Sequence, residues 1–120
     1  MSSAPTTPLP FIHAVTNSAA VRRKEFLATA ERIMKTLGPL GAIHLRSSEI
    51  SGRRFHDLAS KLVAFQAETG CWLIVNDRVD VGAAVGAKGI ELASHSLRVR
   101  LHLLALASDF WAFSSNCARN

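Results

Sequence analysis

The stretch that decides the fold reads LIVNDRVDVGAAVGAKGIELASHSL and spans residues 73–97. The segment from Trp72 to Val75 overlaps the start of this stretch and is apolar on both of its alternating faces. This pattern predicts a strand buried between two layers, as in parallel sheets. The polar run Asn76 to Arg78 follows at the carboxyl end of this strand, where parallel sheets and barrels place their chemistry. A short helix is then predicted around Val81 to Val85, and a second strand from Gly89 to Ala93. The stretch therefore indicates a parallel α/β fold with a site directly after Val75.

The composition is that of a globular chain. Of 120 residues, 48% are hydrophobic and 19% are charged, which excludes a disordered chain and a membrane span. The length allows one domain and is short for a barrel, which usually needs about 200 residues or more. Residues 1–9 lack the features of a signal peptide and are expected to form a flexible leader. Cys71 and Cys117 are predicted to be unpaired thiols, which favours a cytoplasmic location.

The net charge of +5 raises the question of nucleic-acid binding. The basic clusters are Arg22 to Lys24, Arg53 with Arg54, and Arg98 with Arg100. These clusters lie at or near predicted helix starts, and no aromatic residues alternate with them as stacking platforms. We therefore expect no nucleic-acid partner, and solvated helix faces with a general attraction for phosphorylated ligands fit the pattern better.

The rest of the chain alternates between strand and helix. Strands are predicted at residues 11–17 and 42–46, and helical spacing of apolar residues predicts helices over residues 21–37 and 51–70, with Ser51 as N-cap and Gly70 as stop. The strand starts are about thirty residues apart, which is the length of a βαβ unit. We expect one parallel sheet with its four strands in sequence order and right-handed crossovers.

Side-chain alternation assigns each strand residue to one face of this sheet. The apolar set is expected to contact the helices: Ile12, Leu45, Leu73, Val75, Ile90 and Leu92. The polar set is expected on the other face: His13, His44, Arg46, Asn76 and Glu91. So many polar groups are too costly for a sealed core, whereas the interior of a barrel that opens on a ligand site accommodates them. Because alternate strands share interior layers of a barrel, an ion pair between Arg46 and Glu91 is predicted.

Three segments carry a resemblance to a known family. They are HLR at residues 44–46, LIVNDRVDVGAAVGAKGIELA at residues 73–93 and SHSL at residues 94–97. Over about residues 10–97 the chain resembles the thiamine phosphate synthase and TenI family. The resemblance implies a (β/α)8 barrel, here a partial one of about four βα units, with a phosphate-binding pocket at its top. Synthases of this family join an aminopyrimidine pyrophosphate to a thiazole phosphate, whereas TenI-type proteins are aromatising tautomerases of thiazole phosphate.

The resemblance implies phosphate or substrate contacts at the strand ends. The synthase pattern Gln-x-Arg-x-Lys becomes His44, Arg46 and Ser48, so the arginine is kept and the lysine is not. The pattern Ala-x-His-Ser at residues 93–96 looks like the TenI branch. The implied binding residues are His44, Arg46, Ser48, Asn76, Ser94 and His95.

The resemblance also implies a magnesium site, but a weak one. Asp77 stands at the position of one magnesium ligand, beside Asn76, whereas Ser96 replaces the aspartate expected as the second ligand. Magnesium prefers hard oxygen ligands, mostly carboxylates, so one carboxylate and a serine predict weak binding at most.

Several of these residues also have plainer structural interpretations. Asp80 fits a helix cap better than a catalytic residue, and His44 fits a hydrogen-bonded packing residue better than an acid or base. His95 is equally well explained as a surface loop residue. Four further roles stay open on the sequence alone, those of Asp77, His13, Asn17 and Glu91.

After Arg98 the resemblance ends. The last residues predict one more helix through Ala107 and a divergent aromatic tail over residues 108–120, without a fifth strand and without the histidine that tautomerases carry at its end. Residues 10–107 are then the N-terminal half of a barrel with open sheet edges. Three explanations are a truncated or out-of-frame product, a half that assembles with a second copy into a homo-oligomer, and a distinct small binding protein.

Three functions are consistent with these observations. The main hypothesis is a TenI-like protein of thiamine biosynthesis that acts on or binds thiazole phosphate. The alternatives are a thiamine phosphate synthase and a non-catalytic module that binds a phosphorylated small molecule. The missing fifth-strand histidine is the feature that separates the catalytic tautomerase from the non-catalytic module.

Overall fold

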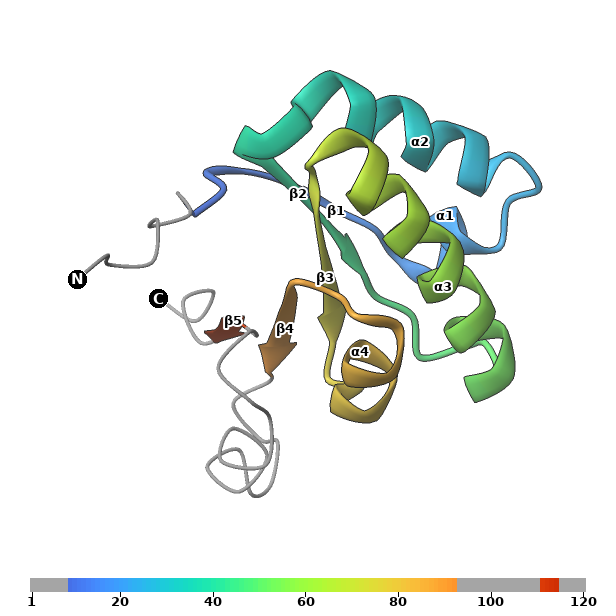
Figure 1. Ribbon diagram of the computed structural model, residues 1–120. Coiled ribbons are helices and arrows are strands. Elements are labelled where there is room, and N and C mark those ends of the chain that lie inside the picture. Colours follow the sequence, from blue (N-terminus) through green and yellow to red (C-terminus); the bar gives the residue numbers. More distant parts are fainter. Residues whose placement is uncertain (1–8, 93–110, 115–120) are drawn as a thin grey trace, which may run out of the picture.

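A computed structural model describes residues 9–92 and 111–114 of the chain, which form one parallel α/β layer structure (Figure 1). The strands are β1 (Ile12–Val15), β2 (Gly41–Leu45), β3 (Trp72–Asn76), β4 (Gly89–Leu92) and β5 (Trp111–Ser114). The helices are α1 (Ser18–Val21), α2 (Phe26–Leu37), the 3-10 turn η1 (Gly38–Leu40), α3 (Gly52–Thr69) and α4 (Val79–Val85). The sheet order is β1-β2-β3-β4-β5, and every neighbouring pair is parallel. The predicted order and direction of the first four strands are confirmed.

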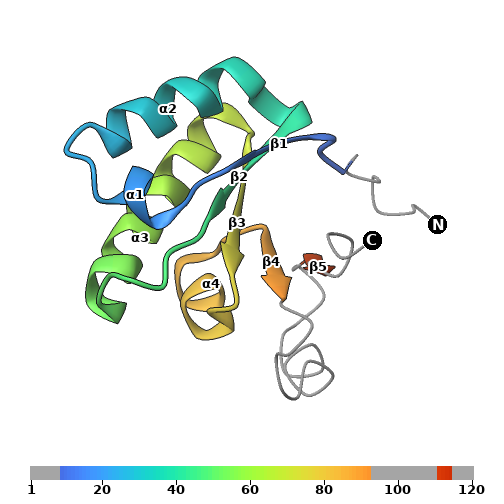
Figure 2. The same cartoon turned by 180° about the vertical axis from the view of Figure 1, so that it is seen from behind.

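The main core lies between the sheet and the helices, and α2 and α3 lie on the same side of the sheet in both views (Figures 1 and 2). Strand residues of one phase point into this core and are fully buried: Ile43, Leu45, Leu73 and Val75. They meet apolar residues of the helices, among them Met34, Phe55, Leu58 and Leu62. The predicted register of β2 and β3 is therefore confirmed.

The opposite face of the sheet carries the other phase of the strands. Ala42, Trp72 and Ile74 form a separate small apolar cluster there, and His44 is also buried. The predicted ion pair between Arg46 and Glu91 is wrong, because the Glu91 carboxylate bonds to the His44 ring at 3.1 Å instead.

The edge strand β1 departs from the expectation in one respect. Ile12 was expected to contact the helices, but it is 47% exposed, and Ala14 is the β1 residue that packs against the main core. The reason is that α2 packs on β2, the next strand inward, so that the outer strand is only partly covered.

The segment after β1 forms two helices in place of the single helix predicted over residues 21–37. The Asn17 side chain caps α1 by accepting a hydrogen bond from the Ala20 N–H at 2.8 Å. The chain leaves the helix at Arg22 and resumes it at Phe26. An early cap therefore starts a short separate helix at the end of β1, and this turn forms one wall of the cavity described below.

The predictions for α3 and for the tail had opposite outcomes. Ser51 caps α3 by accepting from the Arg54 N–H at 3.1 Å, and Gly70 ends it in a left-handed conformation, as predicted. The tail was predicted to contain no fifth strand, which is wrong, since Trp111–Ser114 pairs with β4. The apolar residues of this segment extend the sheet by one parallel strand.

Two further expectations concern the thiols and membranes. Cys71 is free and buried, and burial raises the pKa of its thiol to about 11, which makes it unreactive at neutral pH. Cys117 lies outside the described residues.

Among the helices that the structure describes, none combines the length and apolar character needed to cross a membrane.

Candidate functional site

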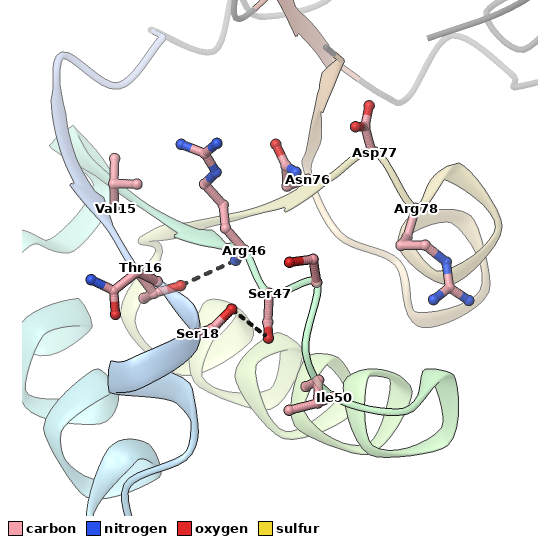
Figure 3. Close-up of a pocket in the computed structure, with 11 residues that line it drawn as sticks. Val15, Thr16, Ser18, Arg46, Ser47, Ile50, Asn76, Asp77 and Arg78 are labelled. Carbon is pink, nitrogen blue, oxygen red and sulfur yellow. Dashed lines mark hydrogen bonds between the residues drawn. The ribbon is translucent and has the colours of Figure 1, made fainter. Parts of the chain in front are cut away.

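A cavity of about 650 Å³ opens at the carboxyl ends of β1, β2 and β3 (Figure 3). Because the strands are parallel, the segments that follow them meet at one edge of the sheet. Three such segments line the cavity: residues 15–18, residues 46–48 with Ile50, and residues 76–78. This is the position at which the sequence predicted a site.

The wall between β1 and β2 is held by hydroxyl groups. The Thr16 hydroxyl donates to the His44 carbonyl at 2.7 Å and accepts from the Arg46 N–H at 3.1 Å. Past the ends of the same two strands, the hydroxyls of Ser18 and Ser47 lie 3.2 Å apart. These bonds fix the backbone of Arg46 while leaving its side chain to extend from a rigid base.

Arg46 is the cation of the site. Its side chain is exposed and extends on the same side of the strand ends as the side chains of Asn76 and Asp77 (Figure 3). Within residues 9–92, its guanidinium makes neither an ion pair nor a hydrogen bond. A guanidinium offers a planar set of donors that matches phosphate or carboxylate, so Arg46 is available for an anionic ligand.

The turn after β3 is strained. Asp77 has a φ of 59°, a value that L residues rarely adopt. Its N–H donates to the Glu91 carbonyl of β4 at 2.7 Å, and the next N–H, of Arg78, donates back to the Asn76 carbonyl at 2.7 Å. Such strain is common where a backbone is held for function, and here it directs two polar side chains to the cavity.

Arg78 lines the cavity but faces away from Arg46 (Figure 3). It makes two hydrogen bonds of 3.3 Å to Asp80 and lies 5.7 Å from the centre of the Phe55 ring. The hydrogen bond from Arg78 lowers the pKa of the Asp80 carboxyl. The prediction that Asp80 caps α4 is wrong, because Arg78 occupies the N-cap position and Asp80 lies in the first turn.

The structure brings some of the predicted site residues together and not others. Arg46, Ser48, Asn76 and Asp77 line the cavity, whereas His44 lies beneath it as a buried, hydrogen-bonded residue. Ser94, His95 and Ser96 lie outside the described residues. Seven lining residues were not in the predicted set: the apolar Val15 and Ile50 and the polar Thr16, Asn17, Ser18, Ser47 and Arg78. The polar ending of the first strand was the signal that pointed to three of these.

The described residues do not complete a magnesium site by themselves. Asp77 is the single carboxylate among the lining residues, and no cluster of three or more His, Cys, Asp or Glu side chains in the described part of the chain is arranged to hold a metal ion. Magnesium bound by protein usually takes one or two carboxylates together with substrate phosphates. Weak magnesium binding at Asp77 therefore stays a prediction.

The fold and the cavity together define a class of protein, a parallel α/β protein of the barrel type with a cavity at its strand ends that the exposed Arg46 lines. The family model for thiamine monophosphate synthase matches residues 12–111, and the chain belongs to this family. The match extends past residue 97, where the sequence resemblance was expected to end.

Individual relatives agree with the family. The thiamine-phosphate synthase of Desulfitobacterium hafniense is 33% identical over 86 residues, which cover 72% of this chain and 41% of the relative. The thiamine-phosphate synthase of Azorhizobium caulinodans is 36% identical over 93 residues, covering 75% and 43%. A solved structure, thiamine phosphate pyrophosphorylase from Pyrococcus furiosus, superposes with a TM-score of 0.69 at 19% identity, over 86% of this chain and 48% of that one. The chain thus spans less than half the length of these relatives.

Proposed function

We propose that the cavity is the anion-binding part of a thiamine phosphate synthase type of site and takes the phosphate or pyrophosphate group of a small substrate. The observation that carries this proposal is Arg46, an exposed guanidinium held on a fixed backbone at the cavity and not neutralised by any described residue. The Asn76 amide beside it supplies a further donor.

The synthase activity is preferred here to the thiazole tautomerase activity that the sequence pattern at residues 93–96 favoured. The relatives reported above bear the name thiamine-phosphate synthase. The cavity also has the character of a phosphate site, with the exposed Arg46 guanidinium and a row of hydroxyl groups. A phosphorylated small molecule, and not a nucleic acid, fits a concave site of this volume.

The proposed site is expected to bind its ligand weakly. An anion in an open, hydrated cavity gains less from a charge than in a buried one, and Ser48 supplies no second positive charge. The experiment is a calorimetric titration of the chain with inorganic pyrophosphate and with thiazole phosphate, repeated for Arg46→Ala. We expect the variant to bind about tenfold more weakly, because a charge-assisted hydrogen bond contributes about 1.5 kcal/mol or more.

The matched control is Arg32→Ala, which removes the same charge from an exposed position on α2, away from the lining residues. Its affinity should stay within about twofold of the unchanged chain if long-range attraction is screened. If both substitutions weaken binding equally, the effect is one of net charge and not of the Arg46 position. If Arg46→Ala binds as tightly as the unchanged chain, the proposal is wrong. Turnover of both synthase substrates in the same samples separates binding from catalysis.

A further inference from the structure

Arg78 is the second arginine at the cavity. It follows β3, whereas Arg46 follows β2, and both line the cavity. Its guanidinium faces away from Arg46 (Figure 3) and makes two hydrogen bonds of 3.3 Å to the two carboxylate oxygens of Asp80. It also lies 5.7 Å from the centre of the Phe55 ring. The cavity thus has one arginine that is available to a ligand and one that a neighbouring carboxylate holds.

The interaction that holds Arg78 is weak. With 42% of the Arg78 side chain and 72% of the Asp80 side chain exposed, water screens the two charges. The 3.3 Å bonds are also longer than the roughly 2.8 Å of a good bond between a guanidinium and a carboxylate. An anion with more charge than one carboxylate can therefore displace Asp80 from Arg78.

The surroundings of the Arg78 guanidinium favour its release as well. A Cβ built on Gly52 would lie 3.5 Å from Arg78 Nη2, so the guanidinium lies beside the first residue of α3. The first turn of α3 has no acidic residue and carries two further arginines, Arg53 and Arg54. The N-terminal end of a helix has a partial positive charge, which is unfavourable for a cation. Asp80 offsets this repulsion, and a phosphoryl group in the cavity can take over that role.

We propose that Arg78 is a second ligand-binding cation of the cavity, which leaves Asp80 and bonds to the second phosphoryl group of a ligand that carries pyrophosphate. This role rests on the function proposed above and narrows its ligand class, because Arg46 alone satisfies a monophosphate whereas a pyrophosphate engages both arginines. The strands β2 and β3 are paired neighbours, about 5 Å apart, so side chains that follow them can reach two groups of one ligand. The cavity of about 650 Å³ has room for such a ligand.

Asp80 competes with the ligand for Arg78. It holds the Arg78 side chain away from Arg46, and a ligand must supply enough attraction to replace it. Inorganic phosphate bound at Arg46 leaves the pair of Arg78 and Asp80 intact, whereas pyrophosphate breaks it. Specificity is a difference between two affinities, and in this site Arg78 raises the affinity for pyrophosphate alone.

The experiment is a calorimetric titration of the full chain with inorganic pyrophosphate and with inorganic phosphate in a metal-free buffer. Arg78→Gln should weaken pyrophosphate binding about fivefold, because the ligand loses a charge-assisted hydrogen bond that outweighs the exposed ion pair it replaces. Phosphate binding should stay within about twofold of the unchanged chain, since a charge that does not touch the ligand is screened. A purely structural role of Arg78 would change both affinities alike.

Asp80→Asn tests the same role with the opposite sign. It releases Arg78 and should tighten pyrophosphate binding about threefold. In a chain that also carries Arg78→Gln the same substitution should have little effect, because no guanidinium remains to be released. Glu49→Gln is the matched control, since Glu49 is likewise an exposed carboxylate, paired at 2.6 Å with an arginine, Arg22, that does not line the cavity. This control should change the affinity little.

The outcomes separate this role from the proposed function. If Arg46→Ala weakens pyrophosphate binding and Arg78→Gln does not, the role of Arg78 is refuted and the proposed function stands. If neither substitution has an effect, both are refuted. An equal effect of Asp80→Asn with and without the Arg78 guanidinium would also refute the role, because it would then be one of net charge. If Arg78→Gln does not fold, Asp80→Asn is compared with Glu49→Gln, and equal effects of these two would refute the role.

Discussion

At the scale of single residues, the charge of Asp77 works against the cation of the site. In the proposed function Arg46 attracts a phosphate group, whereas the Asp77 carboxylate, on the same side of the strand ends, would repel it (Figure 3). The backbone conformation of Asp77 does not depend on its charge, because aspartate and asparagine both tolerate a φ of 59° better than most other residues do. Charge and conformation can therefore be separated by one substitution.

We predict that Asp77→Asn binds inorganic pyrophosphate about three- to fivefold more tightly than the unchanged chain in a metal-free buffer. Removing one unit of negative charge a few ångströms from the ligand relieves roughly 1 kcal/mol at high dielectric, and the asparagine keeps the left-handed turn. Calorimetry in EDTA measures the effect. The same titration with magnesium should show a smaller difference, and a loss of affinity confined to the magnesium series would mean that Asp77 holds the metal.

At the scale of secondary-structure elements, α3 is tied to the sheet through Gln66. Its Oε1 accepts from the Leu73 N–H at 2.8 Å and from the Lys88 N–H at 3.1 Å, and its Nε2 donates to the Gly86 carbonyl at 3.2 Å. One side chain on a helix thus satisfies backbone groups at the starts of β3 and β4. Backbone N–H and C=O groups need hydrogen-bond partners, and a helix side chain supplies them here.

We predict that Gln66→Leu lowers the free energy of unfolding by about 2 kcal/mol, because two backbone N–H groups lose their acceptor. Gln66→Glu keeps the acceptor and loses only the donor to Gly86, so its loss should be smaller. Urea denaturation of the three proteins gives the comparison. Equal losses in both variants would show that the acceptor is not the important feature of this side chain.

The ends of α3 and α4 provide a second pair of substitutions. Gly70 and Gly86 both end their helix with positive φ, at 79° and 84°. A Cβ at Gly70 would lie 3.0 Å from Pro39 Cγ, whereas a Cβ at Gly86 would meet nothing within 4 Å. The two sites share the backbone strain and differ in the steric contact.

We predict that Gly86→Ala lowers the free energy of unfolding by about 1 kcal/mol, the usual cost of placing an L residue in this conformation. Gly70→Ala should cost more, since the ring of Pro39 must also move. Thermal and urea unfolding measure both values. A smaller loss at Gly70 than at Gly86 would contradict the steric account.

At the scale of the whole molecule, the open edge of β1 is the most exposed apolar part of the described chain. Three side chains there are largely solvent-accessible: Phe11 at 70%, Val15 at 59% and Ile12 at 47%. An edge strand with apolar side chains and free backbone groups is a template for pairing with another strand. A second copy of the chain that covers this edge is the homo-oligomer proposed from the sequence.

We predict concentration-dependent self-association of the chain, measured by sedimentation velocity over about a hundredfold range of concentration. Val15→Lys places a charge on the edge and should shift the distribution toward the monomer. Ala84→Lys, at an exposed position on α4 away from β1, is the control and should change the distribution little. A sedimentation coefficient that does not change with concentration in the unchanged chain would exclude this association.

Much of the fold and part of the site could be predicted from local sequence because the signals are local. The alternation of apolar residues from Trp72 to Val75 sets which side chains enter the core, and Ser51 and Gly70 set the ends of α3, since a cap depends on residues within one turn. Arg46 and Asn76 were placed at the cavity because polar residues that follow parallel strands meet at one edge.

Other features were decided by the tertiary structure alone. Alternation places His44, Arg46 and Glu91 on one face but does not determine which of the two basic side chains bonds to the carboxylate. In the fold the buried His44 bonds to Glu91, whereas Arg46 extends to the cavity. The strand order was predicted, but the hydroxyl contacts that link the ends of β1 and β2, from Thr16 to the Arg46 N–H and from Ser18 to Ser47, depend on the tertiary structure. Residues 111–114 join the sheet because β4 offers an edge with unpaired backbone groups, a partner distant in sequence that propensity cannot reveal.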